Sequence, residues 1–246
     1  VACIGMLLAT ALTGCGGDKK GSGDIIKIGA NIEMTGGSAS FGKSAQNGIK
    51  LAIEETNAKG GVLGKKLELV VADNKSEAAE ATNAMQKLIE QDKVVAVIGP
   101  NLSSASIAAT SVNTGAKVLA ISPMGTNPNV TVDKDGKTKD FMFRACFIDP
   151  FQGTVMATFA KDNLKAKNVA ILIDNSSDYA KGLAQFFKEA FTKGGGKIAA
   201  EESYLQKDTD FKATLTKIKA TNPDMIYIHG YYQEVGMIVK QAREMG

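Results

Sequence analysis

The sequence predicts an α/β protein built from two doubly wound parallel-sheet lobes with a hinge between them. Strand-like and helix-like segments alternate from residue 25 to residue 246. Several of the strand-like segments, such as VVAVIGP and NVAILID, are continuous apolar runs, which is typical of strands covered on both faces. The alternation is interrupted once, at residues 124–153, where Asn-Pro, Asp-Gly and Asp-Pro turn signals gather. We therefore expect an N-terminal lobe at 25–145 and a C-terminal lobe at 146–246.

The first lobe begins with a strand at IIKIGANI (25–32) and a helix at SAQNGIKLAIEETNAKGG. Ile49, Ala52 and Ile53 follow helical spacing, and a pair of glycines ends the helix. KLELVVAD (66–73) predicts the next strand, and SEAAEATNAMQKLIEQD predicts a helix with Ser76 as its cap. The lobe continues as strand, helix and strand, at VVAVIGP (94–100), SSASIAATSVNTGA and KVLAISP (117–123).

The second lobe repeats this order of helices and strands. Its predicted helices are GTVMATFAKDNLKA, YAKGLAQFFKEAFTKGGG, DFKATLTKIKATN and QEVGMIVKQAREMG. Its predicted strands are NVAILID, KIAAEESY and DMIYIHG. Two lobes of similar construction make the cleft between them the natural place for a functional site.

The first residues, VACIGMLLATALTGCGG, form an apolar stretch that is too short to cross a bilayer, which takes roughly 20 apolar residues. The stretch indicates a secretory signal region at 1–15, and we expect the sequence to start inside that signal. Leu12-Thr-Gly-Cys15 resembles the lipobox of bacterial lipoproteins, with Cys15 as the lipidated residue. The polar, Gly-rich residues 16–24 predict a flexible tether. An ordinary buried N-terminal segment is the alternative.

Composition argues against several classes of function. The net charge is +3, and no Lys/Arg cluster interleaves with aromatic residues, so we expect no nucleic-acid partner. Cys146 would be the one cysteine left outside the signal and lipobox, and His229 is the one histidine, so we expect no zinc-type metal site and no cofactor. No general base stands beside a candidate nucleophile, so we expect a protein that is not an enzyme.

One sequence motif favours an enzyme instead, because it matches a nucleotide-binding pattern. Gly37–Ser44, GSASFGKS, matches the phosphate-binding pattern G-x-x-x-x-G-K-[ST] between a predicted strand and a predicted helix. Asp73 ends the next strand, where a magnesium-binding acid could stand. An exported protein meets little ATP, so we interpret the match as accidental. A P-loop nucleotide-binding enzyme remains the alternative.

The residues that follow the strands favour a small ligand, because ligands of open parallel sheets lie beyond the carboxyl ends of the strands. Two small, hydroxyl-bearing turns follow strands of the first lobe, Gly99–Ser104 and Ser122–Pro128, and Phe41 follows the first strand. The second lobe offers Tyr179 and Tyr231. This set suits holding a small anionic or zwitterionic molecule. Capping and turn chemistry would equally explain Ser103 or Thr126 alone, and packing would explain the tyrosines.

These residues resemble the leucine/isoleucine/valine-binding proteins, the extracellular solute receptors of branched-chain amino acid ABC transporters. The resemblance covers residues 24–246 and is most specific at ISPMGTNP and FRACFIDPFQG. It implies the type I periplasmic-binding-protein fold, whose lobes close on the ligand, a permease partner in the membrane, an extracytoplasmic location and a monomeric state.

The resemblance also implies a set of ligand-binding residues. Ser103 and Thr126 would bind the carboxylate of the ligand, and the Met124 backbone, in the Met124-Gly125 turn, would help Thr126 hold the ammonium. The remaining residues would face the aliphatic side chain or close from the second lobe: Phe41 and Leu102, and Tyr179 and Tyr231.

Two departures from the family matter. Phe41 stands where the family often has Tyr. The missing hydroxyl makes this side of the expected ligand site more apolar. By resemblance, the acidic partner of the ammonium and the rest of the second lobe lie beyond residue 246, so we expect a truncated second lobe and weak or no binding by these residues alone. A same-fold receptor for an amide, urea or aromatic acid, and a sensory module that presents the lobes to a kinase, are alternatives.

Overall fold

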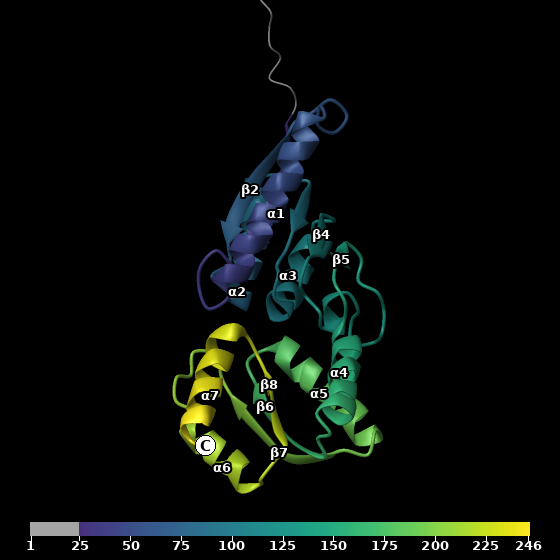
Figure 1. Cartoon of the computed structure of the whole chain (residues 1–246). Coiled ribbons are helices and arrows are strands. Elements are labelled where there is room, and N and C mark those ends of the chain that lie inside the picture. Colours follow the sequence, from purple (N-terminus) through teal and green to yellow (C-terminus); the bar gives the residue numbers. More distant parts are fainter. Residues whose placement is uncertain (1–24) are drawn as a thin grey trace, which may run out of the picture.

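Two parallel β-sheets organise the protein, whose structure, a computed structural model, describes residues 25–246 (Figure 1). The first sheet has the strand order β2-β1-β3-β4-β5 and the second β7-β6-β8, and neighbouring strands are parallel in both. The predicted α/β class with two parallel sheets is confirmed. The predicted signal region 1–15, with Cys15, and the tether 16–24 lie outside the described residues.

The first lobe contains five strands and their helices. In chain order these are β1 (Ile26–Ile32), α1 (Ala39–Ala58), β2 (Leu67–Asp73), α2 (Ala78–Gln86), a π-helical turn (Lys87–Gln91), β3 (Ala96–Ile98), α3 (Ser103–Gly115), β4 (Leu119–Ser122), a short 3₁₀ turn (Pro128–Val130) and β5 (Met142–Arg144).

The second lobe follows after a short connection. Its elements are α4 (Asp149–Thr158), a π-helical turn (Phe159–Asn163), β6 (Asn168–Asp174), α5 (Asp178–Lys193), β7 (Lys197–Tyr204), α6 (Lys212–Ala220), β8 (Met225–His229) and α7 (Tyr232–Glu244). Within residues 25–246, none of the helices has both the length and the apolar character that crossing a membrane requires.

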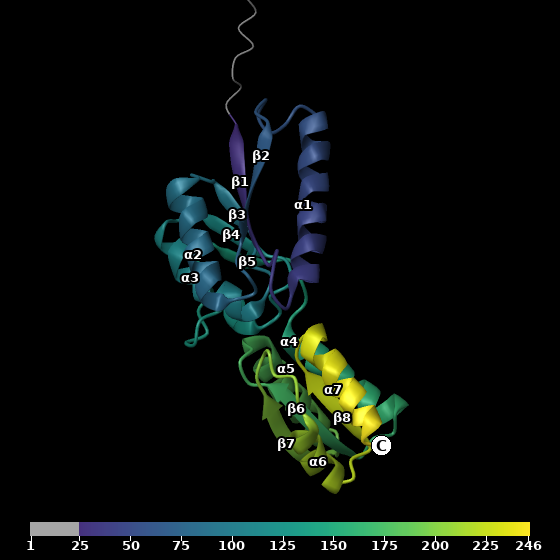
Figure 2. The same ribbon diagram turned by 90° about the vertical axis from the view of Figure 1, so that its left-hand side faces the viewer.

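Helices cover both faces of the first sheet (Figure 2). On one face α1 packs on β1 through Ile49, Ile32 and Ala30. On the other face α2 and α3 enclose a larger core, in which Met85 and Ala109 are fully buried. Burial on both faces explains why the strands of this lobe are apolar rather than alternating.

The central strand of the second sheet shows the same arrangement. Side chains alternate across a strand, so Val169 and Ile171 of β6 face α4 and α5 and pack with Phe187. Ala170 and Leu172 face the opposite way, toward α6 and α7. The run NVAILID is therefore apolar because both of its faces are core.

Some local expectations are wrong. Ser76 does not cap α2: its hydroxyl donates to the Thr35 carbonyl, and Glu77 takes the N-cap position. Strand β5 lies inside the predicted interruption, and it was missed because three residues show no periodicity. Helix α4 begins at Asp149, before the predicted start, because Pro150 fits the first turn of a helix.

Candidate functional site

In each lobe, strand order predicts the edge at which a ligand would bind. In the order β2-β1-β3-β4-β5, the chain leaves β1 for one face of the sheet and leaves β3 for the other, so a crevice forms at the carboxyl ends of these two neighbours. In the second lobe, β6 and β8 are neighbours whose following helices, α5 and α7, also lie on opposite faces. Phe41 and Leu102 follow the first pair of strands, and Tyr179 and Tyr231 follow the second.

A cleft of about 240 Å³ lies where these edges meet, close to the lower end of the roughly 300–1,000 Å³ typical of ligand pockets. Six of the eight ligand-binding residues predicted from sequence line it. They are Phe41, Leu102, Met124, Thr126, Tyr179 and Tyr231. Their shared placement is a finding; their contact with a ligand remains a prediction.

One side of the cleft is aromatic and apolar. Phe41 makes edge-to-face contacts with Tyr231 and Tyr232, at ring-centroid distances of 6.1 and 5.1 Å. Tyr179 stacks on Tyr231 at 5.4 Å. Leu102 packs in the same cluster as Phe41 and Tyr231. Burial strongly raises the pKa of Tyr231, so its hydroxyl stays neutral.

The cleft is also lined by polar groups. The Thr126 hydroxyl is buried and makes no hydrogen bond. It lies near Asp149, whose pKa burial raises to about 6 while Thr126 and Arg144 oppose that rise, but the geometry falls short of a Thr126–Asp149 hydrogen bond. The Tyr179 hydroxyl accepts a hydrogen bond from Gln152 Nε2 at 3.2 Å. Thr126 therefore lines the cleft with a buried hydroxyl that lies near Asp149 but makes no hydrogen bond of normal geometry, and such a hydroxyl could bind a polar ligand group.

Ser103 and Gly125 are not among the residues that line the cleft. The Ser103 hydroxyl accepts a hydrogen bond from the Asn127 backbone N–H at 3.2 Å, and the Gly125 N–H donates to the Ser122 hydroxyl at 3.0 Å. Arg144 donates to the Gly125 carbonyl at 2.9 Å. In this structure these groups position the turn that carries Met124 and Thr126, and the carboxylate-binding role of Ser103 remains a prediction.

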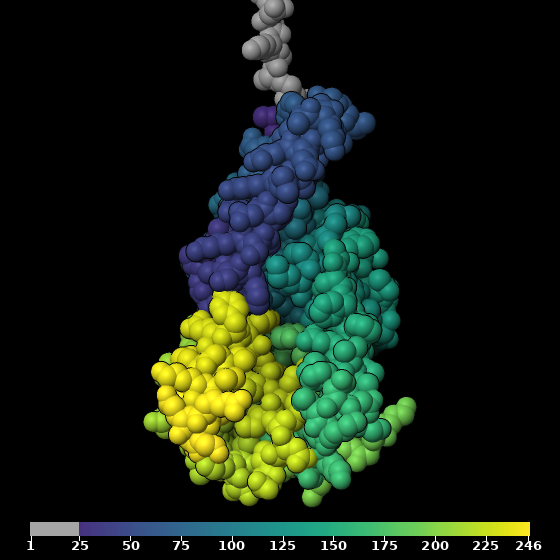
Figure 3. All heavy atoms as spheres, viewed as in Figure 1, coloured from purple at the N-terminus to yellow at the C-terminus, as the bar shows by residue number. Residues whose placement is uncertain are grey.

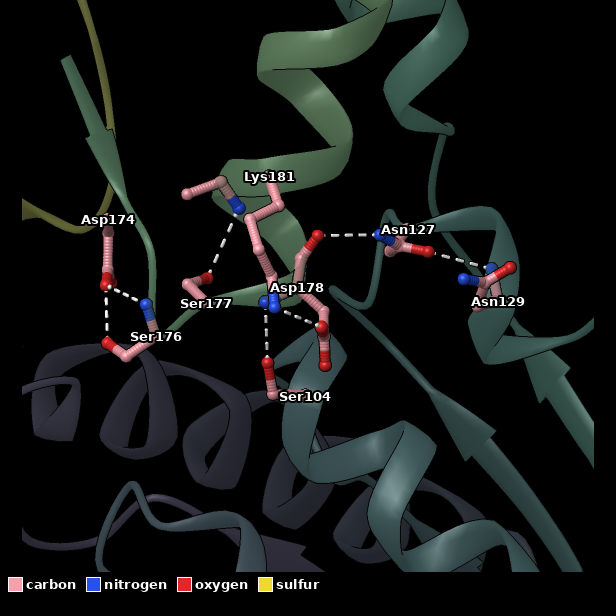
Figure 4. A network of polar contacts seen from close by, with 9 residues as sticks. Ser104, Asn127, Asn129, Asp174, Ser176, Ser177, Asp178 and Lys181 are labelled. Carbon is pink, nitrogen blue, oxygen red and sulfur yellow. Dashed lines mark hydrogen bonds and ion pairs between the residues drawn. The ribbon is translucent and has the colours of Figure 1, made fainter. Parts of the chain in front are cut away.

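Hydrogen bonds join the two lobes beside the cleft (Figure 4). The Ser104 hydroxyl, on α3, accepts from the Asp178 backbone N–H, at the start of α5, at 2.8 Å. Asn127 Nδ2 donates to the Asp178 carbonyl at 2.7 Å. We call Ser104, Asn127 and Asp178 the interlobe clasp. On the other side of the cleft α7 meets α1, where the Tyr232 hydroxyl accepts from Ser40 N–H at 3.2 Å (Figure 3). The lobes are thus in a closed arrangement.

Five of the lining residues were not among the eight ligand-binding residues predicted from sequence. These are Asn101, Phe147, Gln152, Gly230 and Tyr232. All of them stand beside strand ends or in the segments most specific to the family resemblance, which was the available signal. Asn101 is fully buried, and its Nδ2 donates to Glu33 Oε2 at 2.6 Å. Glu33 directly follows β1 and is also fully buried.

The segment Gly37–Ser44 does not form a phosphate cradle. Helix α1 begins at Ala39, and backbone N–H groups of its first turn are already used within the protein. Those of Ser38 and Ser40 donate to the Ser76 and Tyr232 hydroxyls, and that of Phe41 donates to a backbone carbonyl. A Cβ on Gly42 would lie 2.0 Å from the Glu33 carbonyl oxygen, so this glycine serves close packing of α1 on β1.

The remaining reactive side chains stay apart from the cleft. Within residues 25–246, no three His, Cys, Asp or Glu side chains are grouped so that they could hold a metal ion. Burial lowers the pKa of His229 to about 3, so the imidazole is neutral. Its ring packs against Tyr227, with 4.0 Å between the ring centroids. Burial raises the pKa of the Cys146 thiol, which makes it a poor nucleophile at neutral pH.

Comparison with known proteins identifies the family. Residues 25–246, which form most of the chain, match the family described as periplasmic binding protein. The chain belongs to the periplasmic binding protein family. A leucine-binding protein, LivK, of Thermotoga maritima has a similar structure, with a TM-score of 0.82 and 42% identity over 90% of this chain and 61% of the relative.

Two further relatives agree with this family. The branched-chain amino acid transporter substrate-binding protein LivJ of Streptococcus pneumoniae, solved with isoleucine, has a TM-score of 0.83 and 45% identity over 91% of this chain and 62% of its own. An amino acid binding protein of Pseudomonas aeruginosa is 38% identical over 91% of this chain and 58% of its own length. The resemblance to the Leu/Ile/Val-binding proteins and the type I fold it implies are confirmed. The chain spans 58% of the length of that curated relative.

Proposed function

We propose that the protein is the solute receptor of an ABC importer, and that it captures a branched-chain or related amino acid between its lobes and delivers it to a permease. In this proposal Thr126, with Ser103 behind it, binds the carboxylate. Phe41 and Leu102 contact the aliphatic side chain, and Tyr179 and Tyr231 cover the ligand from the second lobe.

The observation that carries this proposal is the composition of the cleft. A cleft of about 240 Å³ suits a small molecule. Leu102, Phe41 and Tyr231 form one apolar wall, and the same cleft is lined by Thr126, whose buried hydroxyl makes no hydrogen bond. A ligand that is polar at one end and aliphatic at the other complements both walls, and the relatives solved or named with leucine and isoleucine support that class.

A location outside the cytoplasm accompanies this function, as the family implies. We propose that Cys15 carries a lipid anchor and that residues 16–24 act as the tether, although both lie outside the described residues. Replacing Cys15 by Ser should move the protein from the membrane fraction to the soluble or secreted fraction. A variant that stays in the membrane fraction would contradict the anchor but not the ligand.

Thermal unfolding of the full-length gene product with candidate ligands tests the proposal. A ligand present at about a hundred times its dissociation constant should add about 2.7 kcal/mol of stability. We expect leucine, isoleucine or valine to raise the midpoint of unfolding by a few degrees, and ATP to leave it unchanged. A rise with ATP and none with amino acids would reject the receptor proposal.

An aromatic acid is the second candidate ligand, because the stacked Tyr179 and Tyr231 rings offer flat surfaces to a ring. Benzoate derivatives in the same panel separate the two ligands. Stabilisation by benzoates without any by aliphatic amino acids would favour the second.

A further inference from the structure

Asn101, which lines the cleft, carries a buried amide oxygen that has no hydrogen-bond partner among residues 25–246. It follows β3 and the residues Gly99 and Pro100, lines the cleft and is fully buried. Its Nδ2 donates to Glu33 Oε2 at 2.6 Å, whereas its Oδ1 has no hydrogen-bond partner. Gly99 permits this position, because a Cβ there would lie 2.0 Å from the Asn31 carbonyl oxygen.

Glu33 fixes which way the Asn101 amide faces. Besides Asn101, it accepts hydrogen bonds from Asn74 Nδ2 at 3.1 Å and from the Leu102 backbone N–H at 3.4 Å. Burial raises the pKa of Glu33, and the hydrogen bonds that it accepts oppose that rise. In its ionised form the carboxylate is an acceptor only, so it faces the NH₂ group of Asn101 and not its carbonyl. The two groups diverge from one carbon atom, so the Asn101 carbonyl points away from Glu33. Asn74 is itself held by Asn31, at 3.1 Å, which ties Glu33 to the end of β1.

We propose that Asn101 is a recognition residue for a hydrogen-bond donor on the ligand, and that Glu33 is its positioning residue. This inference rests on the proposed function and narrows it. An acceptor on Asn101, in the same cleft as Thr126, would select a molecule whose α-substituent carries N–H groups, an amino acid rather than the corresponding oxo acid. The carbonyl oxygen of a 2-oxo acid would face Oδ1 with no hydrogen between them and is disfavoured.

The test compares leucine with 4-methyl-2-oxopentanoate, which has the same side chain and carboxylate but no N–H. Calorimetric titration would measure both dissociation constants for the full-length gene product and its variants. We expect the wild type to prefer leucine clearly. In Asn101→Leu, leucine affinity should fall about ten- to a hundredfold, the range for a hydrogen bond to a charged group, with little change for the oxo acid.

Glu33→Gln separates positioning from contact. A Gln side chain keeps the shape but places an NH₂ group among three donors, so the Asn101 amide loses its fixed orientation. We expect a smaller fall in leucine affinity, about threefold to tenfold, and a reduced preference over the oxo acid, because the competent orientation is then only partly populated.

Asn113 provides the matched control. It is also fully buried with an unpartnered Oδ1, and its Nδ2 donates to the Val118 and Phe141 carbonyls, but it does not line the cleft. Asn113→Leu should lower the unfolding temperature and leave the preference for leucine intact. If Asn101→Leu changes only stability, as this control does, Asn101 is structural and the inference is wrong.

The outcomes also separate this inference from the proposed function. Wild-type protein that binds leucine, with an Asn101→Leu variant that binds it equally tightly, overturns the inference alone. Should Asn101→Leu fail to fold, a Glu33→Gln protein with an unchanged preference for leucine would overturn it in the same way. Wild-type protein that binds benzoates and no amino acid overturns both.

Discussion

Removing one hydrogen bond of the interlobe clasp should weaken ligand binding without touching the ligand. Ser104→Ala deletes the acceptor for the Asp178 backbone N–H, a bond of 2.8 Å between α3 and α5. Such a bond contributes about 1 kcal/mol net, and it exists only while the lobes are closed. Ser104 is not among the residues that line the cleft. We therefore expect the dissociation constant to rise about fivefold, because 1.4 kcal/mol corresponds to tenfold.

Calorimetric titration of leucine into Ser104→Ala measures this change. Ser111→Ala is the control, because Ser111 lies on the exposed face of the same helix. Asn127→Ala should act in the same direction through its 2.7 Å bond to the Asp178 carbonyl, and the double variant should be non-additive because both bonds end on one residue. Equal affinity in Ser104→Ala and the control would refute the reasoning that the clasp stabilises closure.

Three further predictions concern stability. Leu102→Ala should lower the free energy of unfolding by about 2–3 kcal/mol, because Leu102 is almost fully buried in the cluster with Phe41 and Tyr231; denaturant unfolding measures this, and a loss below about 1 kcal/mol would contradict it. Gly42→Ala should cost at least about 2 kcal/mol in the same assay, because its Cβ would lie 2.0 Å from the Glu33 carbonyl oxygen; wild-type stability would mean that α1 can shift freely. Burial raises the pKa of Asp149 from 3.8 to about 6, so the folded state holds this proton more tightly than the unfolded state. Its contribution should therefore fall as pH rises from about 4 to about 6, and Asp149→Asn should be more stable at pH 7 by up to about 3 kcal/mol, less any stabilisation of the charge by the start of α4. Parallel pH curves for wild type and Asp149→Asn would contradict this assignment.

The fold was predictable where burial on both faces leaves a mark on the sequence. The apolar run NVAILID predicts β6, because Val169 and Ile171 face one helical layer while Ala170 and Leu172 face the other. Strand β5 leaves no such mark, since it has three residues at the edge of its sheet. The capping of α2 could not be predicted either. The Ser76 hydroxyl accepts a hydrogen bond from the Ser38 N–H and donates one to the Thr35 carbonyl, and both residues lie some forty positions earlier in the chain.

The candidate site likewise contains residues that could be predicted from the sequence and residues that could not. Residues directly after strands, such as Phe41 and Tyr231, could be proposed from order alone, because parallel strands bring their carboxyl ends to one edge. The roles of polar side chains could not be predicted from the order of the strands. Asn101 depends on Glu33, which is 68 positions away, and Ser103 satisfies a backbone N–H of the neighbouring turn. The sequence alone does not show whether a polar side chain forms its hydrogen bond with the protein or with a ligand.

Under the proposed function, the arrangement of the cleft would make ligand capture and lobe closure one event. The apolar wall needs residues of both lobes, since Phe41 gains its edge-to-face partners Tyr231 and Tyr232 only when α7 meets α1. An open form would therefore offer the ligand Thr126, Asn101 and Leu102 but not the complete wall. A ligand shifts an equilibrium only by its difference in affinity for the two states, and under the proposed function that difference would be the contact with Tyr179 and Tyr231. It follows that changes at the clasp and at these tyrosines should both appear in the dissociation constant, whereas only those at the tyrosines should depend on the side chain of the ligand.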